Sequence, residues 1–155
     1  MANTYTQLHI QIIFAVQGRE RLILPKHKDE LQKFITGIVQ RRNNKLLAIN
    51  CMPDHTHLVI GLHPESAIAS LVRDVKAGSS SFISDKRWLR GRFHWQEGYG
   101  AFSYSRWDLD KIITYVRTQE EHHRRQDFKK EYIKILKEFA IDYDERYLFQ
   151  WVYTG

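Results

Sequence analysis

Apolar residues along this chain recur with two different periods, one typical of strands and one typical of helices. In the range 8–16 every second residue is apolar, which predicts a strand with one side against a core. Shorter apolar stretches at 46–50 and 56–61 predict two more strands, and the intervening Pro53-Asp54 pair predicts a tight turn. The range 93–104 predicts extended structure with a bend marked by its glycines.

Helical repeats lie between these strands. After Pro25, a residue favoured in the first turn of a helix, apolar residues follow at helical spacing and predict a helix that ends near 41–44. A second helix is expected after Ser66, whose hydroxyl is able to cap it. The small residues 77–81 then mark either the end of that helix or a place where its backbone approaches a neighbour.

The C-terminal part of the chain predicts helices. Asp108 opens a third helix, whose apolar stripe ends at Val116. A fourth helical pattern extends from about Phe128 to Phe139, with Asp127 as its candidate cap. The full order is therefore strand, helix, strand, strand, helix, strand, helix.

That order is typical of one fold class. It predicts an α+β, ferredoxin-like (split β-α-β) domain, with an antiparallel sheet, helices on one face and added C-terminal helices. The first and third strands are central in this arrangement, so 56–61 is expected in the middle of the sheet. We interpret residues 1–155 as one domain, with a core of about 5–125 and a C-terminal helical extension of about 126–155.

Composition narrows the functional classes. No apolar run approaches the roughly 20 residues that span a bilayer, and no signal peptide is visible, so we expect a cytoplasmic protein without a membrane segment. The single cysteine, Cys51, is either a reactive thiol or a small residue entering a strand, and it fits a reducing compartment. The net charge of +6 favours a polyanionic partner, usually nucleic acid, although many basic domains bind none.

Two histidines stand at the start of the predicted central strand. Successive side chains of a strand point to opposite faces, so His55 and His57 share a face while Thr56 points the other way. Two neutral imidazoles side by side form half of a site for a divalent metal. The alternative is a pair of partly buried polar residues, and the motif alone does not decide between the two.

Cations gather around Trp88, between the second helix and the next extended stretch. Basic residues interleaved with an aromatic residue are typical of phosphate contact and base stacking. A solvated loop is the alternative. The cations concerned are Lys86, Arg87, Arg90 and Arg92.

A tyrosine and an amide lie four residues apart on the third helix. Tyr115 and Gln119 are therefore stacked on one face, at the margin of the apolar stripe, and His122 continues the same row. Taken alone, Tyr115 is interpreted as a packing residue. The run 120–123 also offers metal ligands, but a charged run at a helix end is usually solvated.

Together, the histidine pair and the helical tyrosine with its amide resemble a known family. The chain resembles the single-tyrosine HUH transposases of small bacterial insertion sequences and their repeat-associated relatives, over nearly its whole length. The matching stretches are 52–57 (MPDHTH), 76–81 (KAGSSS), 95–102 (WQEGYGAF) and 115–123 (YVRTQEEHH). One departure is Thr56, because the family carries a bulky apolar residue between the histidines.

The resemblance implies an enzyme, a DNA transposase that cleaves and rejoins single-stranded DNA at hairpin-marked ends. It implies that Tyr115 is the nucleophile and forms a covalent 5′-phosphotyrosine, while His55, His57 and Gln119 hold a divalent metal, Mg²⁺ or Mn²⁺. A phenol is more acidic than an aliphatic alcohol, so tyrosinate is the better leaving group and a second 3′-hydroxyl is able to reverse the step.

The resemblance also implies a homodimer that recognises DNA hairpins, often with the tyrosine helix of one subunit serving the metal site of the other; the spacing does not decide between the two arrangements. The hairpin backbone would be held by cations of the second helix and of the stretch after it, namely Arg73, Lys76, Lys86, Arg87, Arg90 and Arg92. Two alternatives remain. A non-catalytic DNA- or RNA-binding module of this fold would expose aromatic residues on its central strands, where this chain carries histidines instead. A domesticated relative would keep cleavage without moving an element.

Overall fold

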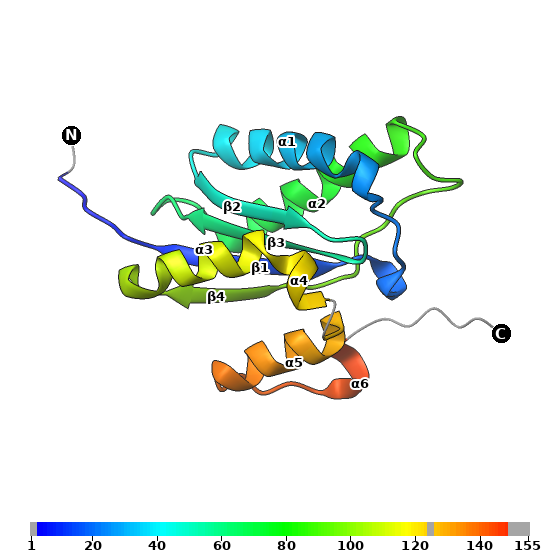
Figure 1. Ribbon diagram of the computed structural model, residues 1–155. Coiled ribbons are helices and arrows are strands. Elements are labelled where there is room, and N and C mark those ends of the chain that lie inside the picture. Colours follow the sequence, from blue (N-terminus) through cyan, green and yellow to red (C-terminus); the bar gives the residue numbers. More distant parts are fainter. Residues whose placement is uncertain (1–2, 124–125, 149–155) are drawn as a thin grey trace.

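The computed structural model describes residues 3–123 and 126–148. In these residues the strands form a four-stranded antiparallel sheet in the order β2-β3-β1-β4, with β1 and β3 in the centre (Figure 1). The strands are β1 (His9–Ala15), β2 (Lys45–Cys51), β3 (His55–Gly61) and β4 (Gly100–Tyr104). The predicted α+β, ferredoxin-like arrangement is confirmed, including the central place of the histidine strand.

Helices cover both faces of this sheet (Figure 1). They are α1 (Pro25–Arg41), α2 (Ile68–Asp85), α3 (Leu109–Arg117), α4 (Gln119–His123), α5 (Phe128–Glu138) and α6 (Glu145–Leu148), with short 3-10 turns η1 (Gln17–Arg19) and η2 (Arg106–Asp108). The crossover helices α1 and α2 share one face, as predicted, and the added helices α3 and α5 pack on the other. The part of the predicted extension after Leu148 lies outside the described residues. Among the helices described, none combines the length and apolar character needed to cross a membrane.

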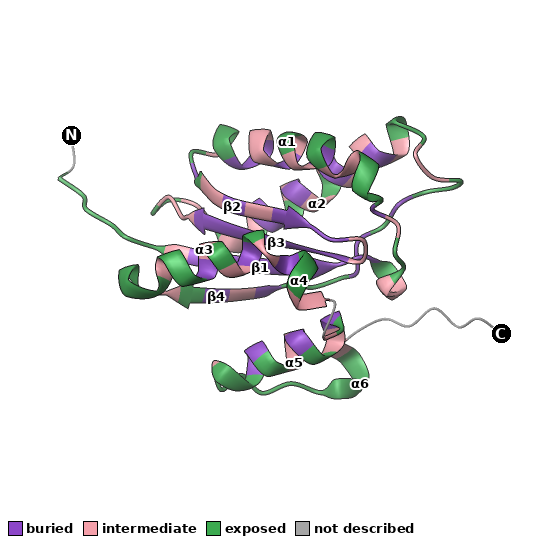
Figure 2. Cartoon of the chain, in the orientation of Figure 1, coloured by how far each residue is buried: buried purple, intermediate pink, exposed green. Residues whose placement is uncertain are grey.

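The central strands are buried on both faces (Figure 2). In β1 the predicted alternation is confirmed, because Ile10, Ile12 and Phe14 pack against α1 and α2. The intervening residues face the other side of the sheet, where Ile13 packs with residues of α5. Burial on both faces fixes the register of a strand, since a slip by one residue would exchange its two sets of side chains.

The opposite face carries two separate apolar clusters. One lies under α3 and joins Val59 of β3 to Val116. The other lies under α5 and joins Ile13 of β1 and Phe102 of β4 to Ile135. Polar residues of β1 and β3 occupy the strip between the two clusters, and this strip becomes the candidate site.

Helix α2 differs from the sequence prediction at both ends. Its N-cap is Ala67, so the predicted Ser66 cap is wrong; the Ser66 hydroxyl instead accepts a hydrogen bond from the Asn44 amide. The helix also continues through the small residues 77–81 to Asp85. Of the two interpretations of 77–81, the close approach of the backbone to a neighbour is confirmed. A Cβ on Gly78 would lie 2.8 Å from Cδ1 of Ile38 in α1.

The predicted third helix is interrupted. Thr118 adopts φ −106° and ψ 29°, so α3 ends at Arg117 and α4 begins at Gln119. The predicted cap of the next helix is confirmed, because the Asp127 side chain accepts a hydrogen bond from the Lys130 amide. The break at Thr118 places Tyr115 and Gln119 on different helices, although they remain close.

The contact between α1 and α2 supplies a test of this packing. We expect Gly78→Val to lower the free energy of unfolding by about 1–3 kcal/mol, because the new side chain displaces Ile38 in a packed core. Gly37→Ala is the control in α1, where a Cβ meets no described atom within 4 Å and alanine is favoured over glycine in a helix. Urea unfolding measures both, and equal stability of Gly78→Val and wild type would contradict the close contact.

Candidate active site

The histidine pair lies in the strip between the two apolar clusters. His55 and His57 are fully buried on the face that α3 and α5 cover, with ring centroids 5.0 Å apart. Thr56 is buried on the opposite face, which carries the β3 residues Leu58 and Ile60 of the main core. The predicted sidedness of the strand is therefore confirmed.

The outer nitrogen of each imidazole is hydrogen-bonded to an acceptor. Nδ1 of His55 lies 2.6 Å from a carboxylate oxygen of Asp54, and Nδ1 of His57 lies 2.8 Å from Oε1 of Gln11. Gln11 is held in turn by a hydrogen bond from its Nε2 to the hydroxyl of Tyr104. Because both partners accept, each Nδ1 carries the proton and each Nε2 presents a lone pair to the interior of the site.

Gln119 contributes an oxygen to the same point. Its Nε2 donates to the backbone carbonyl of Tyr115 at 3.2 Å, so its Oε1 turns toward the histidines. That oxygen lies 3.4 Å from Nε2 of His55. The Gln119 side chain is fully buried, as expected of a group that serves the site rather than the solvent.

Glu131 of α5 supplies a further oxygen. Its Oε1 lies 3.2 Å from Nε2 of His57 and 3.7 Å from Nε2 of His55. Within the described ranges, His55, His57 and Glu131 form a buried group whose ligand atoms all lie within 4.8 Å of one another. Imidazole nitrogens with carboxylate and amide oxygens are ligands that suit Mn²⁺ and Mg²⁺. The convergent acceptors therefore fit a divalent metal.

His123 lies beside these acceptors. Its Nε2 is 3.0 Å from Oε1 of Gln119 and 3.1 Å from Oε1 of Glu131, which makes it a donor to both. Burial opposes its charge, but the hydrogen bond to Glu131 and the negative charge there outweigh burial and raise the pKa of His123. Burial lowers the pKa of His57 to about 4, so this imidazole is neutral at pH 7, as a metal ligand must be.

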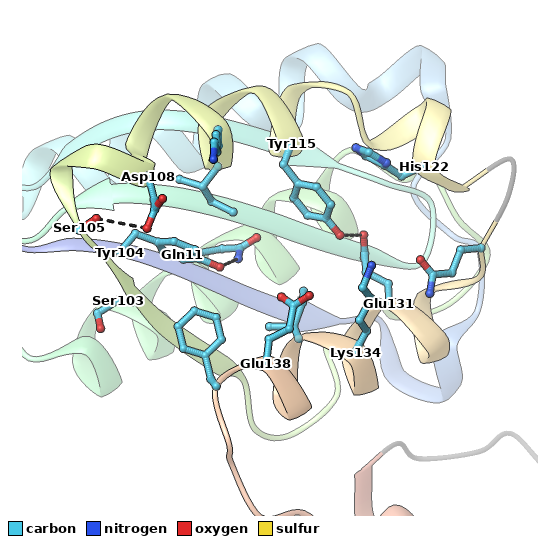
Figure 3. A pocket seen from close by; sticks show the side chains of 15 residues that line it. Gln11, Ser103, Tyr104, Ser105, Asp108, Tyr115, His122, Glu131, Lys134 and Glu138 are labelled. Carbon is cyan, nitrogen blue, oxygen red and sulfur yellow. Dashed lines mark hydrogen bonds between the residues drawn. The ribbon is translucent and has the colours of Figure 1, made fainter.

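Tyr115 approaches the site from α3. Its hydroxyl donates a hydrogen bond to Oε2 of Glu131 (Figure 3). Its ring centroid lies 6.1 Å from that of His57. On its other side the ring of His122 lies 4.7 Å away, so the predicted row on this face is present. Burial and the negative charge of Glu131 raise the pKa of Tyr115 well above its ordinary value, and the phenol is protonated.

A groove between α3 and α5 leads to Tyr115 (Figure 3). Its volume is about 630 Å³. Lysines line both of its walls, and the carboxylates of Asp108 and Glu138 lie among them. Lining residues include Gln11, Tyr104, Lys111, Tyr115, Glu131 and Lys134. The groove reaches the hydroxyl of Tyr115 and the carboxylate of Glu131 from one side of the sheet.

The predicted site residues fall into two groups. His55, His57, Tyr115 and Gln119 come together around one point, whereas the predicted DNA-binding cations belong to α2 and the loop after it, across the sheet from that point. Arg73 is exposed and contacts Asp74. Lys76 donates to the backbone carbonyls of Gln96 and Gly98, and Lys86 pairs with Glu30 at 2.6 Å. Arg87, Arg90 and Arg92 are exposed.

The predicted stacking residue Trp88 already has partners. Its ring stacks on that of His27, with centroids 4.0 Å apart and planes 5° apart. It also meets Phe82 edge-on. Trp88 therefore anchors the loop to α1 and α2 in this structure.

Sequence reasoning did not select four residues of the site. Gln11 and Asp54 orient the imidazoles, and Glu131 and His123 face the candidate ligand atoms. A signal existed for three of them. His123 belongs to the run 120–123, which offers ligands but was interpreted as solvated. Gln11 interrupts an apolar strand, and Glu131 stands in the apolar stripe of its helix, three residues after Phe128 and four before Ile135.

Comparison with known proteins gives the family. A family model described as "Transposase IS200 like" matches residues 4–119. The chain belongs to the IS200-like transposase family. The ISDra2 transposase TnpA of Deinococcus radiodurans is 24% identical over 120 residues, covering 74% of this chain and 86% of the relative. The IS200 transposase of Salmonella typhimurium is 22% identical over 126 residues, covering 78% and 82%.

Solved structures share the fold of this transposase. One is a crystal structure of a candidate transposase from Deinococcus radiodurans, with a TM-score of 0.60, 23% identity and coverage of 77% of this chain and 95% of that one. Another is a REP-associated tyrosine transposase bound to a REP hairpin, with a TM-score of 0.61, 15% identity and coverage of 79% and 73%. The family match ends at residue 119, so α5 with Glu131 lies beyond it.

Proposed function

We propose that this transposase cleaves and rejoins single-stranded DNA at hairpin-marked ends through a covalent 5′-phosphotyrosine, with Tyr115 as the nucleophile. The observation that carries the proposal is the hydroxyl of Tyr115 beside a point where buried nitrogen and oxygen acceptors converge. A solved relative of the same fold is bound to a REP hairpin, which supports a hairpin as the DNA element.

His55, His57 and Gln119 would hold a divalent metal, Mg²⁺ or Mn²⁺, with Glu131 as an additional oxygen ligand. When bound, the metal offsets negative charge on a non-bridging oxygen of the scissile phosphate as the nucleophile attacks. Asp54 and Gln11 keep the imidazoles in the tautomer that ligation requires.

Tyr115 performs the bond exchange. Its hydroxyl loses a proton and its oxygen bonds to phosphorus, while the bond from phosphorus to the 3′ oxygen breaks and that oxygen leaves as a 3′-hydroxyl. In the rejoining step a 3′-hydroxyl loses its proton and attacks the same phosphorus. Tyr115 then leaves and regains its proton, so strand transfer needs no external energy source.

Two surfaces that carry cations would hold DNA. The groove with Lys111 and Lys134 would take the single strand to Tyr115. Across the sheet, the exposed Arg73, Arg87, Arg90 and Arg92 would contact the backbone of the hairpin, whereas Lys76 and Lys86 already have partners within the chain. Binding that weakens as salt rises is expected of such contacts.

The nucleophile is tested with a labelled hairpin. Incubation of single-stranded hairpin DNA carrying a 3′ label with the protein and Mn²⁺ should give an adduct that contains the 3′ fragment and survives a denaturing gel. Tyr115→Phe should abolish it, while Tyr5→Phe, at a tyrosine that is 91% exposed, should not. An adduct that persists in Tyr115→Phe would refute the assignment. No adduct with any hairpin of the source genome would favour the non-catalytic binding module.

The metal site is tested through a residue that touches an imidazole from outside. Gln11→Leu removes the acceptor for Nδ1 of His57 at similar volume, and loss of such a partner weakens metal binding by about 10–100-fold. Gln40→Leu, at an exposed position of α1, is the matched control. Titration with Mn²⁺, in which electron paramagnetic resonance reports the concentration of the free ion, measures the Mn²⁺ affinity of both variants. Wild-type affinity in a folded Gln11→Leu variant would argue against ligation by His57.

We also propose a homodimer in which each copy uses its own site, because described residues of a single chain supply Tyr115, Gln119 and the histidines. Mixing Tyr115→Phe with His57→Ala should therefore restore no adduct formation. Sites shared between two copies would instead recover up to about a quarter of wild-type activity in a random mixture of subunits. Light scattering on the same samples establishes whether dimers are present.

A further inference from the structure

The carboxylate of Glu131 faces two different partners. Its Oε1 points to the acceptors around the proposed metal position, 3.2 Å from Nε2 of His57. Its Oε2 accepts the hydrogen bond from the hydroxyl of Tyr115. One rigid group of three atoms therefore connects the two halves of the site.

The spacing around Oε1 is that of ligands on a common ion. With bonds of about 2.1 Å and octahedral geometry, neighbouring ligand atoms lie roughly 3 Å apart, and distortion widens this. Oε1 lies 3.2 Å from one imidazole nitrogen and 3.7 Å from the other, and Oε1 of Gln119 lies 3.4 Å from Nε2 of His55. The oxygen of Glu131 therefore lies at a distance from the other candidate ligands that a shared ion would require.

Packing leaves this carboxylate little freedom. Glu131 is 3% exposed and lies on the stripe of α5 that also buries Phe128 and Ile135. Phe128 stacks on His55, with centroids 4.0 Å apart and planes 9° apart, which docks the helix against the histidine strand. A carboxylate is stable in a buried position only when its oxygens are paired with donors. The site supplies these donors as the hydroxyl of Tyr115 and Nε2 of His123.

We propose that Glu131 is a positioning residue of the active site, one that ties the hydroxyl of Tyr115 to the metal and orients it toward the scissile phosphate. The inference rests on the proposed metal-dependent cleavage. It assigns a role to α5, which lies beyond the residues that the family model matches. A misplacement of a reacting group by about 1 Å lowers the rate about 10²-fold, so a fixed hydroxyl matters for the reaction.

A double-mutant cycle on Mn²⁺ affinity tests the link without any cleavage assay. The variants are Tyr115→Phe, Glu131→Gln and the double substitution. In the wild-type background, Tyr115→Phe should weaken Mn²⁺ binding roughly 3-fold or more, because the carboxylate loses the hydrogen bond that orients it. In the Glu131→Gln background the same change should have less than about a 2-fold effect.

Single-turnover cleavage supplies the second readout. Glu131→Gln keeps an oxygen for the metal but loses the acceptor for Tyr115, so we expect cleavage to slow about 10²-fold with unchanged DNA affinity. Glu121→Gln, at an exposed carboxylate of α4, should cleave within about 2-fold of wild type. Glu131→Asp keeps the charge but is one carbon shorter, so it should bind Mn²⁺ and still cleave slowly. This variant replaces Glu131→Gln in the test if Glu131→Gln fails to fold.

The outcomes separate this inference from the proposed function. Additive Mn²⁺ effects, or wild-type cleavage by Glu131→Gln, would overturn the positioning role while a Tyr115-dependent adduct keeps the proposed function intact. Wild-type protein that binds no Mn²⁺ and forms no adduct would overturn both.

Discussion

Mutual repulsion among buried acceptors is the constraint on which the site depends. Lone pairs of two imidazoles, an amide and a carboxylate meet among buried side chains, and such a cluster is stable only if positive charge or a proton donor lies among them. In this structure His123 and the hydroxyl of Tyr115 donate to the cluster, and the carboxylate that His123 contacts raises the pKa of that imidazole. A bound cation would satisfy all of the acceptors at once. The surrounding residues hold the acceptors in place, since Asp54 and Gln11 fix each ring from the outer side.

The sheet explains why this arrangement is rigid. The histidines belong to a strand that is paired on both sides and packed on both faces, so their Cα positions are set by two neighbouring strands and two layers of helices. Separate apolar clusters under α3 and α5 flank the polar strip. The polar residues are thus enclosed by packing that would form without them, and the fold bears the free-energy cost of burying them.

Much of this could be predicted from residue spacing. Period-two alternation placed His55 and His57 on one face, and the i, i+4 relation brought Tyr115 near Gln119 even though Thr118 breaks the helix. Both relations are local, and local geometry follows from backbone periodicity. Glu131 could not be placed in this way. It meets His57 across 74 residues of chain, and the contact depends on how α5 docks. The role of Gly78 was left open for the same reason. A small residue marks either the end of a helix or a close contact between two helices, and the choice depends on how α1 docks against α2.

The stripe of α5 has a consequence for any change in that helix. Phe128, Glu131 and Ile135 lie on the same face, so one docking orientation fills the apolar cluster and presents the carboxylate. Inserting one residue before Glu131 would rotate the rest of the helix by about 100° and remove both together. The same face of α5 therefore contributes both apolar core contacts and the carboxylate of the candidate site. A variant library selected for folding alone would retain the orientation of α5, and with it the position of the Glu131 carboxylate.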